Sequence, residues 1–67
     1  MLKIIVNGDE KRVEAPVHLQ SFLEGLKLDP KKVAVERNLE IVPKSTFSNV
    51  MLADGDRLEI VHFIGGG

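Results

Sequence analysis

The chain has 67 residues, of which 43% are hydrophobic and 28% are charged, and its formal net charge is −1. A chain of this length forms one domain and buries only about 60% of its unfolded surface, so its core must be economical. The small net charge favours neither nucleic acid nor an anionic membrane, and no apolar run is long enough to cross a bilayer.

The first elements predicted along the chain are two strands joined as a β-hairpin. Residues 2–6 alternate in part between apolar and polar side chains, and residues 9–14 form the return strand. Between them stands Asn7-Gly8, the strongest short hairpin signal, because both residues accept positive φ. Pro16 ends the return strand since it supplies no N–H to a sheet.

A helix follows the hairpin. Its apolar residues recur at i, i+3, i+4 and i+7, which places them on one stripe that must face a core. We expect it to end near Leu26, because Gly25 is unfavourable inside a helix. Its start is weakly marked, since His18 stands where Ser, Thr or Asp is usual. The stripe consists of Leu19, Phe22, Leu23 and Leu26.

The second half of the chain predicts three more strands. Residues 33–37 and 40–42 are separated by a turn at Asn38, and residues 57–64 form the longest and most regular strand. Asp-Gly-Asp at 54–56 is a tight turn. Residues 44–52 show no clean period and predict an irregular connection with a helical turn.

This order of elements predicts an α+β fold, the β-grasp arrangement of ubiquitin-like proteins. We expect a mixed sheet of four to five strands with one main helix on one face. Residues 1–64 form the β-grasp domain, and residues 65–67 form a flexible C-terminal glycine tail. One helix covers one face only, so the other face meets solvent or a partner.

Alternation assigns the strand residues to two faces. We predict that seven of them face the helix, and that Ile5, Val61 and Phe63 gather on the open face if the first and last strands are neighbours. Together with Ile64 they form a candidate partner-docking surface, although single exposed apolar residues are also ordinary. The predicted inward residues are Leu2, Ile4, Val6, Val33, Val35, Leu58 and Ile60.

Residues before the tail do not predict an active site. The chain has no cysteine, which excludes disulfides, thiolate metal ligands and a nucleophilic thiol, and which suits a reducing cytoplasm. His18 and His62 have no third ligand at metal spacing, and Asp54 and Asp56 are first of all turn residues. We therefore expect no bound metal or cofactor, and a protein that is not by itself an enzyme.

The glycine tail offers chemistry of a different kind. Gly65, Gly66 and Gly67 extend at most about 10 Å and carry no side chains, so they can enter a narrow slot in another protein. A terminal carboxylate has a pKa near 3.5, so it is ionised at neutral pH and can attack an activated phosphate without a general base. A partner must supply the nucleotide and the charge stabilisation.

Three stretches of the sequence resemble the ThiS family, the sulfur carriers of thiamine biosynthesis. They are V-A-V-E-R-N-L-E-I-V-P (33–43), L-A-D-G-D-R-L-E-I-V (52–61) and the closing F-I-G-G-G. The resemblance covers nearly the whole chain. One departure is Leu39, which follows Asn38 where the family often has glycine, so we expect a different turn type there.

Membership would imply a defined reaction sequence at Gly67. A ThiF-like enzyme adenylates its carboxylate with ATP, sulfur from a persulfide donor replaces AMP, and the resulting thiocarboxylate passes sulfur to thiazole synthase. Gly66 would complete the family's Gly-Gly end, with Gly65 as a spacer. ATP would belong to the activating partner.

Three other interpretations stay open at this point. The small subunit of molybdopterin synthase uses the same terminal chemistry, but its last strand usually leads into a proline-containing segment that this chain lacks. A ubiquitin-like modifier would pass the activated Gly67 to a lysine. A plain binding module would have the glycines as a loose end and would tolerate substitution of Gly67.

Overall fold

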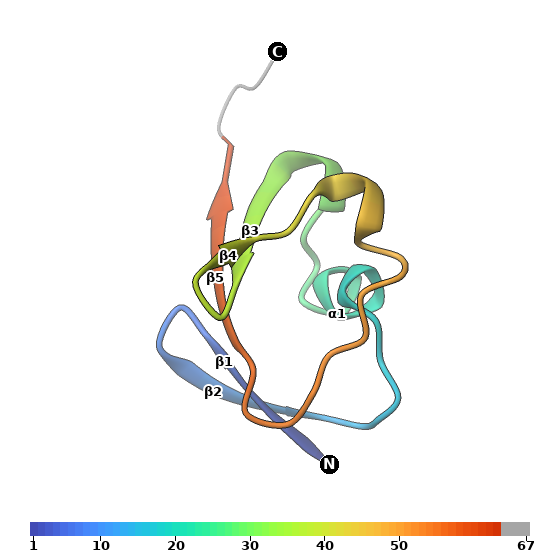
Figure 1. The fold of residues 1–67 in the computed structure, drawn as a ribbon, viewed down its shortest axis with the longest axis vertical. Helices are drawn as coiled ribbons and strands as arrows, with labels where there is room; N and C mark the ends of the chain where they lie inside the picture. The colour runs from blue at the N-terminus through green and yellow to red at the C-terminus, as the bar shows by residue number, and fades with distance from the viewer. Residues whose placement is uncertain (64–67) are drawn as a thin grey trace.

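A computed structural model of the chain describes residues 1–63; Ile64, Gly65, Gly66 and Gly67, and with them the predicted tail, lie outside the described residues. Five strands form one mixed sheet in the order β2-β1-β5-β3-β4, and helix α1 (Leu19–Gly25) lies against one of its faces (Figure 1). The ubiquitin-like β-grasp fold predicted from the sequence is confirmed.

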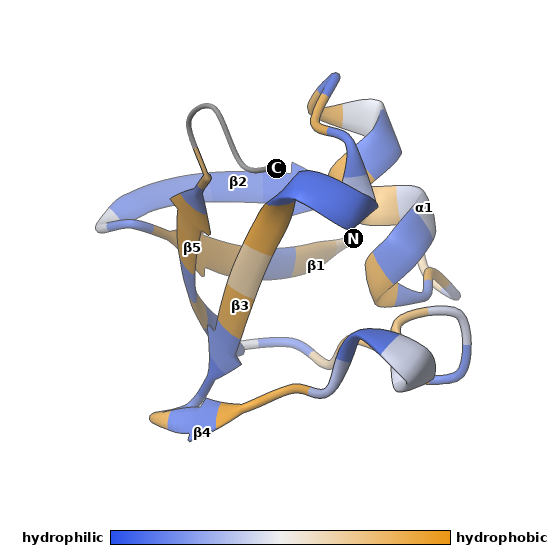
Figure 2. Cartoon of the chain, turned by 90° about the horizontal axis from the view of Figure 1, so that it is seen from above, coloured by the Kyte–Doolittle hydropathy of each residue, from blue (hydrophilic) through white to orange (hydrophobic). Residues whose placement is uncertain are grey.

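The N-terminal hairpin consists of β1 (Leu2–Val6) and β2 (Asp9–Val13), paired antiparallel. Asn7 and Gly8 connect them with φ of 48° and 89°, the left-handed pair that a two-residue hairpin turn requires. β2 is an edge strand whose residues are almost all charged and exposed, as its hydrophilic colour in Figure 2 shows. Charged side chains on an edge discourage pairing with another chain.

The last strand, β5 (Arg57–His62), lies in the middle of the sheet. It pairs parallel with β1 and antiparallel with β3 (Val33–Arg37). The long regular run of the sequence therefore becomes the central strand. It ends at His62, so Phe63 is not part of it, and Ile64, the last residue of the predicted 57–64, lies outside the described residues.

The second hairpin joins β3 to the short edge strand β4 (Glu40–Ile41). Asn38 and Leu39 form its turn with φ of 52° and 73°. The expectation of a different turn type is therefore wrong, because Leu39 adopts the left-handed conformation that glycine would take in its place. An L-residue held there is strained by about 1–2 kcal/mol.

Two short 3₁₀ helices, η1 (Pro30–Lys32) and η2 (Lys44–Thr46), lie in the connections around β3 and β4. The Asp29 side chain accepts a hydrogen bond from the Lys31 N–H at 2.9 Å and so caps η1. η2 is the helical turn predicted within residues 44–52.

Helix α1 begins after His18, which caps it despite being an uncommon residue there. Its Nδ1 accepts a hydrogen bond from the Ser21 N–H at 3.1 Å. The helix ends at Gly25, one residue before Leu26, near which its end was predicted, and Lys27 follows with a φ of 64°. Hydrogen bonds from Lys27 and Leu28 back to the last turn complete a Schellman motif.

The core lies between α1 and the sheet. All seven predicted inward residues are buried or pack against the buried cluster. The connection between β4 and β5 adds two more, Phe47 and Leu52, which are 2% and 6% exposed. The sequence pattern missed them because this segment has no regular period to reveal which side chains point inward.

Candidate functional site

The open face of the sheet is organised by the register of β5. Ile5 of β1 lies opposite Arg57, whereas Val61 lies opposite Ala34 of β3. Four residues of strand, or about 13 Å, therefore separate Ile5 from Val61 along the sheet. The expected close cluster of Ile5, Val61 and Phe63 does not form, because β1 ends before β5 reaches Val61.

Val61 is the most exposed apolar side chain on β5, with 60% of its surface accessible. Two residues nearer the start of β5, Glu59 lies directly opposite Glu36 of β3, and both are exposed. Like charges at opposite positions repel one another and destabilise a sheet. The open face thus combines an apolar position near the end of β5 with an acidic pair in its middle.

The end of β5 is tied to the connections on either side of β3 and β4. The Phe63 N–H donates to the Lys32 carbonyl at 2.8 Å, which continues the β3–β5 ladder one residue beyond the Val33–His62 pair. The Phe63 ring lies 5.0 Å below the Lys44 ammonium, within cation–π range. Phe63 is therefore held through both its backbone and its ring, immediately before the glycine-rich end of the sequence.

The start of β5 is fixed by a buried aspartate in the 54–56 turn. Asp56 is 5% exposed. Its carboxylate accepts hydrogen bonds from Arg37 Nε at 2.9 Å, the Ala53 N–H at 2.8 Å and Asn38 Nδ2 at 3.1 Å. Burial by itself raises the pKa of Asp56, but these donors outweigh it and hold the pKa below its ordinary value. The predicted turn is present, and the ion pair joins it to the β3–β4 hairpin.

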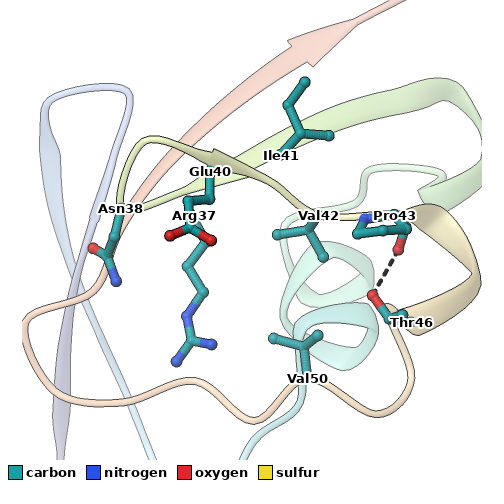
Figure 3. A pocket seen from close by; sticks show the side chains of 8 residues that line it. All are labelled: Arg37, Asn38, Glu40, Ile41, Val42, Pro43, Thr46 and Val50. Carbon is teal, nitrogen blue, oxygen red and sulfur yellow. Dashed lines mark hydrogen bonds between the residues drawn. The ribbon is translucent and has the colours of Figure 1, made fainter.

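Beside this ion pair an open cavity of about 420 Å³ lies between the β3–β4 hairpin and η2 (Figure 3). Ile41, Val42 and Val50 give much of its lining an apolar character. Arg37 also lines it, but its guanidinium is already bonded to Asp56 and, through Nη2 at 3.1 Å, to the Met51 carbonyl. The cavity is therefore a space beside a structural ion pair rather than a site with a free cationic group.

The remaining candidate residues stay apart. His18 caps α1 and His62 ends β5, and nowhere in residues 1–63 do three or more His, Cys, Asp or Glu side chains converge as metal ligands would. Asp54 instead accepts a hydrogen bond from the Lys3 N–H at 2.7 Å, which ties its turn to β1. Within the same residues, no helix has both the length and the apolar character needed to cross a membrane.

Strand β5 thus begins after the 54–56 turn, which the Asp56 hydrogen bonds fix in place, and runs along the open face of the sheet. The sequence Ile64–Gly67 follows Phe63. A model of the ThiS family matches residues 4–67 and so includes this C-terminal sequence. The chain belongs to the ThiS family. The match runs to Gly67, the residue on which the resemblance in sequence placed the chemistry.

Individual relatives agree with this assignment. The sulfur carrier protein ThiS of Bacillus subtilis is 49% identical over 49 residues, which cover 73% of this chain and 74% of that protein. A crystal structure of the thiamine biosynthesis protein ThiS from Geobacter metallireducens superposes with a TM-score of 0.82 at 30% identity, covering 98% of this chain and all of that one.

Another relative is a much longer protein. Thiazole synthase of Paramagnetospirillum magneticum is 53% identical over 66 residues, which cover 98% of this chain and 20% of that protein. This ThiS-family chain spans about a fifth of the length of the thiazole synthases that it matches. A ThiS-like sequence therefore occurs within thiazole synthase itself in such relatives.

The sequence did not reveal the roles of three residues that shape the site, Asp56, Arg37 and Lys44. Asp56 was assigned only to a turn, and its partner Arg37 lies 19 residues earlier in the chain, so no local pattern connects them. Lys44 lies in a segment without periodicity. Its position over Phe63 depends on how η2 packs, which the sequence does not indicate.

Proposed function

We propose that this ThiS-family chain is a sulfur carrier for thiazole formation in thiamine biosynthesis, and that the carboxylate of Gly67 carries the sulfur. The observation that supports this most is the family match through Gly67, together with the naming of the Bacillus subtilis relative as a sulfur carrier. The chain would be a protein co-substrate, with catalysis supplied by its partners.

The first step would be adenylation by a ThiF-like partner. One oxygen of the Gly67 carboxylate attacks the α-phosphorus of ATP, and pyrophosphate leaves. The carboxylate needs no general base because it is ionised at neutral pH. The chain would bind no nucleotide itself, so ATP and the groups that stabilise the developing charge belong to the partner.

The second step would exchange oxygen for sulfur. The terminal sulfur of a persulfide attacks the acyl carbon and AMP leaves, which produces an acyl disulfide. A thiol then attacks this disulfide, releasing the Gly67 thiocarboxylate as a new disulfide forms between the two donor sulfurs. The sequence contains no cysteine, so both the persulfide and the thiol must come from other molecules.

The acceptor would be thiazole synthase. The occurrence of a ThiS-like sequence within thiazole synthases supports this choice over the acceptor of molybdopterin synthesis. The open face around Val61 is the proposed docking surface, with Phe63 and Ile64 leading from it into the partner's active site. Ile5 lies farther along the same face and would contribute at its margin.

Isotope exchange between ATP and pyrophosphate tests the adenylation step. With a ThiF-like enzyme, the full chain should support exchange, and a variant lacking Gly67 should not, while both give the same circular dichroism spectrum. Exchange that persists without Gly67 would contradict the proposal. The cytoplasm is the proposed location, and fractionation of cells with an antibody against the chain would test it.

A further inference from the structure

Lys44 makes two contacts that meet at the end of β5. Its Nζ donates a hydrogen bond to the Lys31 carbonyl at 2.9 Å and lies 5.0 Å from the centre of the Phe63 ring. Lys31 and Lys32 form the last part of η1, and the Lys32 carbonyl accepts the hydrogen bond from the Phe63 N–H at 2.8 Å. One ammonium group therefore links η2, η1 and Phe63.

These contacts hold Phe63 in two ways. The backbone of Phe63 is bound to η1, and its ring is bound to η2 through Lys44. The two attachments act on different parts of Phe63, because one backbone hydrogen bond alone leaves its side-chain torsions free to rotate. Phe63 is 45% exposed and is not one of the buried core residues, so packing in the core does not hold it.

We propose that Lys44 is a positioning residue. By holding the Phe63 ring against the η1–η2 end of the sheet, it fixes the point from which the C-terminal residues extend. The inference rests on the proposed function at Gly67. Four residues separate Phe63 from the Gly67 carboxylate, a reach of at most about 14 Å. The position of Phe63 therefore limits the region that the Gly67 carboxylate can reach in a partner's active site.

Positioning of this kind has a particular kinetic signature. When Phe63 is already held, only the residues beyond it must be ordered on binding. Loss of the Lys44 contact adds Phe63 to the residues that must be ordered, and so weakens association. Once the carboxylate has reached the nucleotide, the partner holds it, and the chemical step is unchanged. Loss of the Lys44 contact should therefore raise KM and leave kcat nearly the same.

The experiment compares three lysine variants in the adenylation assay. Lys44→Met keeps the aliphatic chain and removes the ammonium, whereas Lys44→Arg keeps a cation that also stacks on aromatic rings. Lys31→Met is the control: it removes a positive charge from a residue that contacts Lys44 through its backbone carbonyl and not through its side chain. We expect Lys44→Met to raise KM about three- to tenfold with kcat changed less than about twofold. Lys44→Arg and Lys31→Met should stay within about twofold of the unaltered chain in both constants.

A fourth variant tests the contact from the side of Phe63. Phe63→Leu keeps an apolar side chain for the partner but removes the ring. If Lys44 acts through that ring, the double variant Lys44→Met/Phe63→Leu should raise KM no further than Phe63→Leu alone. Additive effects of the two changes would overturn the inference.

Hydrogen exchange of the Phe63 amide gives a readout that does not depend on activity. In Lys44→Met this amide should exchange about three- to tenfold faster, while the Ile60 amide keeps its rate and Lys31→Met changes neither. Equal behaviour of Lys44→Met and Lys31→Met, in KM or in exchange, would overturn the inference. If the unaltered chain supports no adenylation, the proposed function fails, and Phe63 exchange alone then decides whether Lys44 holds Phe63.

Discussion

Asn7 and Ile60 are 53 residues apart in the sequence and share two hydrogen bonds. Asn7 Oδ1 accepts from the Ile60 N–H at 2.7 Å, and Asn7 Nδ2 donates to the Ile60 carbonyl at 3.1 Å. The Asn7 backbone N–H already donates to the Leu58 carbonyl at 2.9 Å. The side chain therefore supplies one further rung where β1 has ended, and it fixes the stretch of β5 that leads to the proposed docking surface.

Replacing Asn7 should separate its two roles in the turn and in the sheet. Asn7→Ala loses both hydrogen bonds and places at positive φ a residue that tolerates this conformation less well than asparagine, so the free energy of unfolding should fall by about 2–3 kcal/mol. Asn7→Asp keeps the acceptor and tolerates this φ, so it should cost less than half as much. Urea denaturation measures both, and equal losses in the two variants would show that the bonds to Ile60 contribute little.

The Asp56 carboxylate should make stability depend on pH in acid. Because the folded protein holds its pKa below the ordinary value of 3.8, the stabilisation is complete well above that pH and is lost as the pH falls through the folded pKa. Asp56→Asn should lower the unfolding free energy by about 2 kcal/mol at pH 7, since Arg37 then loses its partner ion. The difference between the two proteins should shrink below pH 3.8, and a constant difference across the acid range would contradict the role given to this carboxylate.

Leu39 offers a stabilising substitution. It is 90% exposed and has a φ of 73°, so its side chain gains little from packing and its backbone is strained. Leu39→Gly should raise the unfolding free energy by about 0.5–1 kcal/mol, after allowance for the greater freedom of glycine in the unfolded chain. Thermal denaturation gives the sign, and a lower melting temperature would mean that the exposed leucine makes contacts that offset its strain.

A charge at the exposed end of β5 should disturb docking more than folding. Val61→Asp places a carboxylate in the proposed contact with the ThiF-like enzyme, and we expect affinity to fall at least about tenfold, because burying that charge is costly. Leu39→Asp is the matched control, since it also replaces an exposed apolar residue, at a turn that aspartate accepts. Isothermal titration calorimetry on both variants locates the interface, and an equal loss in both would place it elsewhere.

Local patterns in the sequence were enough to predict most of the fold. The hairpin at Asn7-Gly8, the helix stripe from Leu19 and the central strand from Arg57 each rest on a periodicity or a turn signal within a few residues. Side-chain contacts across long separations could not be predicted in this way. Two such contacts join Asn7 to Ile60 and Arg37 to Asp56. In each pair the sequence marks the residues only as turn or strand positions, and they come together only in the folded sheet.

The candidate site was likewise predictable where a local pattern marks it, and not where it depends on how distant strands pair. The terminal glycines and the resemblance to the ThiS family predict the family, and a ThiS family model matches residues 4–67, whereas the role of Gly67 stays a prediction. The expected grouping of Ile5 with Val61 was wrong because it depended on the register between β1 and β5, which no feature of the sequence specifies. A shift of four residues along a strand changes no hydrophobic pattern but separates two side chains by about 13 Å.

The central claim is that Gly67 carries sulfur, and the most direct test is the intact mass of the chain after incubation with ATP, a ThiF-like enzyme, a persulfide donor and a thiol. We predict a gain equal to the replacement of one oxygen by one sulfur, located at Gly67 by fragmentation and absent when ATP is omitted. Transfer of that sulfur to purified thiazole synthase, and not to a molybdopterin-forming acceptor, would then identify the pathway. An unchanged mass, with the same enzyme and donor converting the Bacillus subtilis carrier, would contradict the claim.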